Sequence, residues 1–85
     1  MSFRFTAHAI EQMNRRRPDG AAVERVLANP GQVREERLGR EALQSRVHFP
    51  DSEYLLRAIV DRRADPPAVV TIYRTRYIAK YWKQE

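Results

Sequence analysis

Histidine, tyrosine and arginine side chains supply the groups in this chain that are best suited to acid–base chemistry at a phosphate. His8 lies in the first turn of a helix predicted over residues 7–16, where the helix dipole favours the neutral imidazole that a general base requires. His48 alternates with Arg46 along a predicted strand, so an imidazole and a phosphate-binding guanidinium share one face. Tyr73 lies in a later strand, and its phenol suits substrate positioning or proton donation. These four residues are the candidate catalytic residues.

Each candidate also has an ordinary structural interpretation. His8 can hydrogen-bond near the helix cap, and His48 can be one residue of a solvated strand face. Tyr73 stands between two threonines, a pattern that β-propensity alone explains. The sequence leaves both interpretations of each residue open.

Basic residues are concentrated towards both ends of the chain. Of the 16 basic residues 14 are arginine, and the net charge is +5. Residues 1–18 carry four arginines against one acidic residue, and residues 66–85 carry four basic residues against one acidic residue. If the two ends meet in space they form a basic patch that suits a phosphate-bearing partner, although a compositional bias towards arginine explains the same count. The candidate RNA- and phosphate-binding residues are Arg15, Arg16, Arg57, Thr71, Arg74 and Arg76.

The hydrophobic pattern predicts an α+β fold with two N-terminal helices packed on one face of a roughly four-stranded antiparallel sheet. A brief strand at residues 3–5 precedes the first helix, and the apolar spacing predicts a second helix over about 20–28. Period-two patterns predict strands over 32–38, 42–49, 54–62 and 68–76, whereas residues 77–85 fit either a closing helix or an edge strand.

Hydrogen-bonding and cationic side chains gather on the sheet face opposite the predicted helices. In the last strand, Val69 is expected on this polar face, and Val70 and Ile72 on the other. Three strands contribute to the polar face, which resembles the lining of a cleft: Gln44, Arg46, His48, Arg57, Thr71, Tyr73 and Thr75.

The length of 85 residues indicates a single domain over residues 1–85. The chain has no cysteine, its two histidines show no metal-ligand spacing, and its three glycines form no phosphate loop, so no metal and no cofactor are expected. Neither a signal peptide nor an apolar run of about 20 residues is found. A cytoplasmic protein without membrane contact is expected.

Several short motifs occur in an order that resembles a small bacterial family known as domain of unknown function 4258. They are Thr6-x-His8-Ala9, Met13 within the first helix, Asn29-Pro30, the run VVTIYRT and a late YW pair. That family is grouped with the fold of barnase, colicin ribonuclease domains and RelE-type toxins, many of which cut RNA without a metal. The resemblance highlights His8, Arg16, Thr71 and Tyr73. Gln12 departs from the family pattern, which has an arginine there, so either Arg15 replaces that charge or the site is weakened.

Together these features favour a metal-independent endoribonuclease of toxin type, of unknown oligomeric state. RNA carries its own nucleophile in the 2′-OH, so the protein needs a base, cations to stabilise the phosphorane, and an acid for the leaving 5′-oxygen. Toxins of this type are normally held by an acidic antitoxin, so an acidic protein partner is implied. The alternative is a non-catalytic module that binds RNA or an acidic protein segment through the same basic surface.

Overall fold

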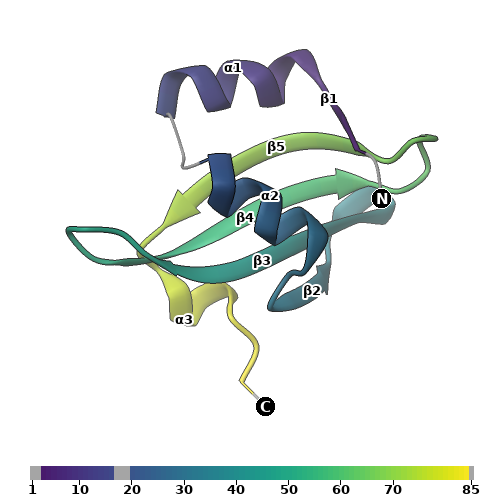
Figure 1. Ribbon diagram of the computed structural model, residues 1–85. Helices are drawn as coiled ribbons and strands as arrows, with labels where there is room; N and C mark the ends of the chain where they lie inside the picture. The colour runs from purple at the N-terminus through teal and green to yellow at the C-terminus, as the bar shows by residue number, and fades with distance from the viewer. Residues whose placement is uncertain (1–2, 17–19, 85) are drawn as a thin grey trace.

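The computed structural model describes residues 3–16 and 20–84, with the side chain of Arg16 outside the described part. The described residues form five strands, three α-helices and one 3₁₀ turn (Figure 1). In chain order they are β1 (Arg4–Phe5), α1 (Ala7–Arg16), α2 (Gly20–Ala28), β2 (Gln32–Glu35), the 3₁₀ turn η1 (Arg37–Gly39), β3 (Arg40–His48), β4 (Glu53–Asp61), β5 (Ala68–Thr75) and α3 (Ile78–Tyr81).

The strands form one mixed sheet in the order β1-β5-β4-β3-β2. All neighbouring pairs are antiparallel except β1 and β5, which are parallel. The predicted α+β fold with two N-terminal helices is therefore confirmed, but the four-stranded antiparallel sheet is corrected to five strands. The correction arises because the short N-terminal strand joins the sheet, where the N–H of Arg4 donates to the carbonyl of Pro67 at 2.9 Å and that of Thr6 to the carbonyl of Val69 at 3.0 Å.

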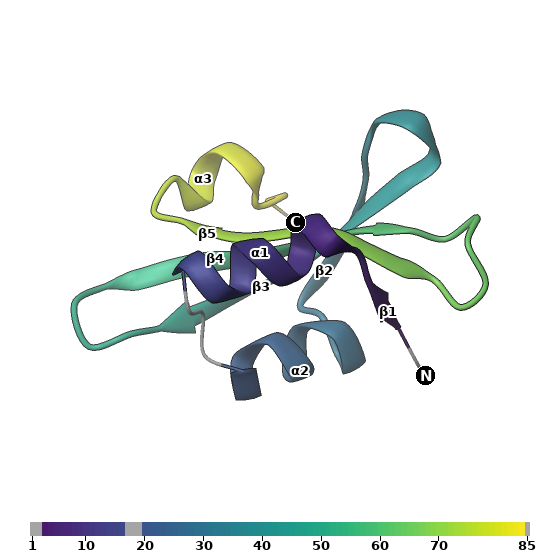
Figure 2. The same ribbon diagram turned by 90° about the horizontal axis from the view of Figure 1, so that it is seen from above.

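Thr6 fixes the start of α1 and its position on the sheet. Its hydroxyl accepts a hydrogen bond from the N–H of Ala9 at 3.1 Å, as a helix N-cap does, and donates one to the carbonyl of Val70 at 3.0 Å. One side chain therefore caps α1 and attaches it to β5, and α1 then lies along that strand (Figures 1 and 2).

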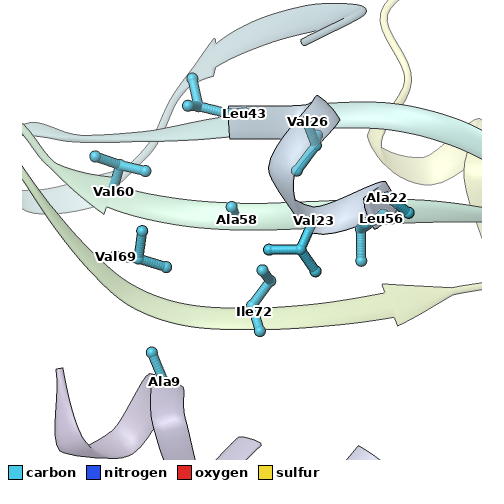
Figure 3. Packing of buried hydrophobic residues seen from close by; sticks show 10 residues of the cluster. All are labelled: Ala9, Ala22, Val23, Val26, Leu43, Leu56, Ala58, Val60, Val69 and Ile72. Atoms are coloured by element: carbon cyan, nitrogen blue, oxygen red, sulfur yellow. The ribbon is translucent and has the colours of Figure 1, made fainter. Parts of the chain in front are cut away.

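The hydrophobic core lies between α1, α2 and one face of the sheet (Figure 3). In β5, both Val69 and Ile72 belong to this core, so the prediction that Val69 lies on the polar face was wrong. The cause is a register irregularity at Ile59 and Val60 of β4, where Val60 pairs with Val69 and Ile59 with Thr71. The intervening Val70 is the extra residue of the bulge, and the bulge changes the alternation of side chains along β5.

The C-terminal segment closes the opposite, polar face of the sheet. Its helix α3 lies on the side away from α1 and α2 (Figure 1). The carbonyl of Tyr81 accepts hydrogen bonds from Nη1 of Arg34 at 2.7 Å and Nε2 of Gln44 at 3.1 Å, and the N–H of Lys83 donates to Oε1 of Gln32 at 3.0 Å. The tail is thus a short helix with an extended end, and it covers much of the expected cleft.

Candidate nucleic-acid interface

Arg57 occupies the centre of the polar face and is buried, with only 3% of its surface exposed. Its Nε donates to Oε1 of Gln44 at 2.9 Å and its Nη1 to the hydroxyl of Tyr73 at 2.5 Å. Its Nη2 lies 3.4 Å from Oε2 of Glu36, and the ring of Tyr81 lies 4.3 Å from its guanidinium carbon. Every guanidinium nitrogen has an internal partner and the side chain is buried, so Arg57 organises the sheet face and is not accessible to a phosphate.

Tyr73 is the candidate catalytic residue that lies closest to this network. Burial raises the pKa of its phenol, and the bond from Arg57 opposes that effect, so the phenol is protonated at neutral pH. Because the oxygen accepts a hydrogen bond from Arg57, the phenol can donate its proton to a neighbour, and its hydrogen bond with Tyr81 raises the pKa of Tyr73 further. Thr71 lies on the same half-buried face, two residues away in β5.

The two histidines lie away from Tyr73. His8 is exposed on α1, in the layer that covers the opposite face of the sheet. His48 is at the end of β3, with its side chain 84% exposed and Nε2 3.4 Å from Oε2 of Glu53. It follows Gln44 by four residues, which places it about 13 Å along the strand from the centre of the polar face. The structure therefore does not bring the candidate proton-transfer groups together.

Arg46 shares the polar face with His48 but contacts the C-terminal segment. Its guanidinium carbon lies 5.2 Å from the centroid of the Trp82 ring, and the side chain is exposed. Arg46 therefore remains accessible to a ligand, in contrast to Arg57.

A second group of arginines and aromatics surrounds the β3–β4 hairpin at one end of the sheet. The guanidinium carbon of Arg74 lies 4.6 Å from the ring centroid of Phe49 and 4.4 Å from that of Tyr54. The two rings meet edge to face, with centroids 5.3 Å apart. Among the described residues no carboxylate pairs with Arg74, so its positive charge is uncompensated at close range.

Arg76 lies beside this pair and is partly neutralised. Its Nη2 is 3.2 Å from Oδ2 of Asp51, and its Nε donates to the hydroxyl of Tyr54 at 3.3 Å. The hydroxyl of Tyr54 in turn donates to the same carboxylate oxygen at 2.6 Å. This bond, together with Arg76, lowers the pKa of Asp51, whereas the bonds that Arg76 donates to Tyr54 and Asp51 raise the pKa of Arg76.

An open hollow of about 610 Å³ lies beside these side chains, lined by residues of β4, β5 and the turn that follows. Tyr77 borders it with 76% of its surface exposed. We call these residues the hairpin-end surface: Phe49, Tyr54, Arg74, Arg76 and Tyr77. Sequence analysis identified Arg74 and Arg76 but missed Phe49 and Tyr54. The signal available was their position on either side of the turn at residues 50–52, since such flanking residues meet in a hairpin.

The two basic ends of the chain converge in part. In both views α1 ends over the end of the sheet at which β5 ends, so Arg15 belongs to the same end of the molecule as the hairpin-end surface (Figures 1 and 2). Arg15 is exposed and pairs with Glu11 at 3.2 Å. Arg4 lies at the beginning of β1, beside Ala68 at the other end of β5, and does not join this patch.

Within residues 3–16 and 20–84, no three histidine, aspartate or glutamate side chains are grouped as a metal site would require. No helix in the same part of the chain is long and apolar enough to span a membrane.

The fold and the exposed side chains define a small α+β domain with a closed polar sheet face and a basic, aromatic surface at the hairpin end. The chain belongs to a family described as Domain of unknown function (DUF4258), whose model matches residues 5–74. The match extends from β1 almost to the end of β5, and α3 lies outside it. No curated protein and no solved structure matches the chain.

Proposed function

We propose that this domain binds single-stranded RNA through the hairpin-end surface. The observation that carries the proposal is the exposed guanidinium of Arg74, which lies over two aromatic rings and has no carboxylate partner in the described part of the chain. Guanidinium groups beside exposed rings are typical of single-strand binding, because the cations contact phosphates while the bases stack.

Each residue of this surface has a distinct expected role. Arg74 contributes an uncompensated charge to a phosphate, and Tyr77 presents its exposed ring to a base. Arg76 is oriented by Asp51 and Tyr54 and provides a second, weaker phosphate contact. Binding is therefore expected to weaken as salt rises, with each phosphate contact adding about 0.7 to the slope of log affinity against log salt.

The test is the binding of a labelled 12-nucleotide single-stranded RNA, measured by fluorescence anisotropy at several salt concentrations in EDTA. Tyr77→Ala is expected to weaken binding at least about fivefold, from the loss of one stacked base. Arg74→Ala is expected to weaken it and to reduce the salt slope by about 0.7. Arg37→Ala is the matched control, because it removes another exposed arginine, in η1 before the start of β3 and away from the hairpin end. Equal losses of RNA affinity for Arg37→Ala and Arg74→Ala would refute the proposal that RNA binds at the hairpin-end surface.

Metal-independent cleavage of RNA is the second candidate function, and the Arg57–Tyr73 hydrogen bond favours it. A protonated phenol polarised by a guanidinium can donate its proton to a leaving 5′-oxygen while the 2′-oxygen attacks phosphorus. The motifs resemble a family that is grouped with the fold of barnase- and RelE-type ribonucleases, which is a further reason to propose this activity. Binding ranks above cleavage because neither His8 nor His48 lies beside Tyr73 to accept the 2′-OH proton.

The same RNA, analysed on a denaturing gel after incubation in EDTA, tests cleavage. Products with 2′,3′-cyclic phosphate ends that disappear with Tyr73→Phe would support it. Parallel reactions with His8→Ala and His48→Ala would identify the proton acceptor. Intact RNA that the wild-type protein binds in a salt-dependent manner would favour the binding module alone.

A further inference from the structure

The second half of β3 is a free sheet edge. β2 pairs with β3 only over residues 41–44, whereas β3 continues to His48. The carbonyl of Arg40 faces β2, because it accepts a hydrogen bond from the N–H of Glu36 at 2.8 Å. Backbone groups alternate in direction along an antiparallel strand, so the N–H and C=O groups of Arg46 and His48 also point to that side, where no strand of the described chain follows.

A hollow of about 320 Å³ lies beside this edge, between α2 and β3. Ala22 and Val26 of α2 and Val47 of β3 contribute apolar side chains to it, and Arg25 contributes an exposed charge. Arg46 and His48 lie on the other face of the same edge and are both exposed. A strand added here would therefore meet a hollow of mixed apolar and polar lining on one face and the exposed side chains of Arg46 and His48 on the other.

We propose that this edge accepts an extended segment of a partner protein in which acidic and apolar residues alternate. Residues directly opposite in neighbouring strands share a face. The partner residues opposite Arg46 and His48 would then lie on the polar face, where a carboxylate complements the charge of Arg46. The residue opposite Val47 would lie over the hollow beside α2, where an apolar side chain fits. Backbone hydrogen bonds supply affinity and the alternating side chains supply specificity.

Charge selects this partner over a second copy of the chain. The residues that present backbone groups to the edge are Arg46 and His48, so two copies paired symmetrically about Arg46 would place the two Arg46 side chains opposite each other. Like charges directly opposite each other are destabilising, and charged edge residues generally prevent self-association. The imidazole of His48 already lies 3.4 Å from Oε2 of Glu53, so Arg46 provides most of the attraction for the acidic residues of the segment.

The test uses a labelled seven-residue peptide of alternating glutamate and valine, titrated into the intact protein, with a lysine–valine peptide as the charge control. The acidic peptide is expected to bind and the basic peptide to bind at least tenfold more weakly. Arg46→Glu is expected to weaken binding of the acidic peptide at least tenfold, whereas Arg37→Glu, the same charge change at the far end of β3, leaves it unchanged. Equal effects of the two substitutions, or equal binding of the two peptides, would overturn the proposal.

Amide hydrogen exchange of the wild-type protein gives a second readout that does not depend on the folding of a variant. Saturation with the acidic peptide is expected to slow exchange at the N–H groups of Arg46 and His48. Unchanged exchange there would mean that the peptide does not add to β3. The proposal is independent of RNA binding, because Arg74→Ala is expected to leave peptide affinity unchanged. A loss of peptide binding in that variant would instead indicate that the peptide binds by general attraction to a basic surface that includes Arg74, and not at the edge of β3.

Discussion

Replacement of Arg57 by alanine tests whether the polar face is held together by one buried cation. The substitution leaves Oε1 of Gln44 without its donor in a residue that is 0% exposed, at a cost of about 1–3 kcal/mol. It also removes a desolvated contact with the Tyr81 ring, which contributes about 2 kcal/mol. Glu36 is 37% exposed and becomes hydrated once its partner is lost, so it adds little. The expected destabilisation is about 4 kcal/mol.

Urea and thermal unfolding followed by circular dichroism measure this change. For a domain of this size, about 4 kcal/mol corresponds to a fall in Tm of at least about 15 °C. Arg46→Ala is the matched control, because Arg46 also lies over an aromatic ring of the C-terminal segment but is exposed. Its loss is expected to cost less than about 1 kcal/mol.

A double-mutant cycle separates the hydrogen bond from general packing. Gln44→Ala combined with Arg57→Ala removes both partners, so the orphaned carbonyl oxygen no longer contributes. The double variant is expected to be more stable than the sum of the two single losses predicts, by about 1–2 kcal/mol. Additive losses, or a cost for Arg57→Ala as small as that for Arg46→Ala, would refute the account of a central buried cation.

Three further predictions concern other parts of the molecule. Leu38 is exposed with φ of 61°, so Leu38→Asn is expected to raise the urea midpoint by an amount that corresponds to about 0.5–1 kcal/mol. The pKa of Asp51 is lowered mainly by the Tyr54 hydroxyl, so the ionised carboxylate stabilises the fold above the ordinary pKa of 3.8, and this stabilisation is lost as the pH falls below that value. In Asp51→Asn, the free energy of unfolding measured in urea should therefore change less between pH 5 and 2 than in the wild-type protein. Trp82 is the one tryptophan of the chain, and Arg34 donates to the carbonyl that precedes it, so Arg34→Ala is expected to shift the fluorescence emission to longer wavelength as the segment loosens.

Local patterns were enough to predict most elements of the fold. The bounds of α1 and α2 followed from the Thr6 cap and from the apolar spacing of α2. The strands β3 to β5 followed from period-two alternation, with ends that differ by one or two residues. The parallel pairing of β1 was not predictable in this way, because two residues have no periodicity and the pairing depends on contacts with β5, which is more than sixty residues away.

Two features of the polar face escaped sequence analysis for physical reasons. The bulge at Val70 changes which β5 residues share a face. A period-two pattern in the sequence does not indicate where a bulge inserts an extra residue. The position of the tail depends on its carbonyl groups, since Tyr81 accepts hydrogen bonds from two different strands through its backbone. Every residue type has the same backbone carbonyl acceptor, so no sequence motif predicts which carbonyls hold the tail on the sheet.

The burial of Arg57 changes which arginines are available for binding. Of the sequence-predicted phosphate ligands, Arg57 lies on the polar face that was expected to line a cleft, yet it is held by Gln44, Tyr73 and Glu36. The ring above it comes from α3, outside residues 5–74 that match the family. The matched part therefore supplies a charged sheet centre, and a segment beyond it supplies the cover. Arg46 at the edge of β3 and Arg74 at the hairpin end are exposed by contrast, and both of these arginines lie within the matched residues.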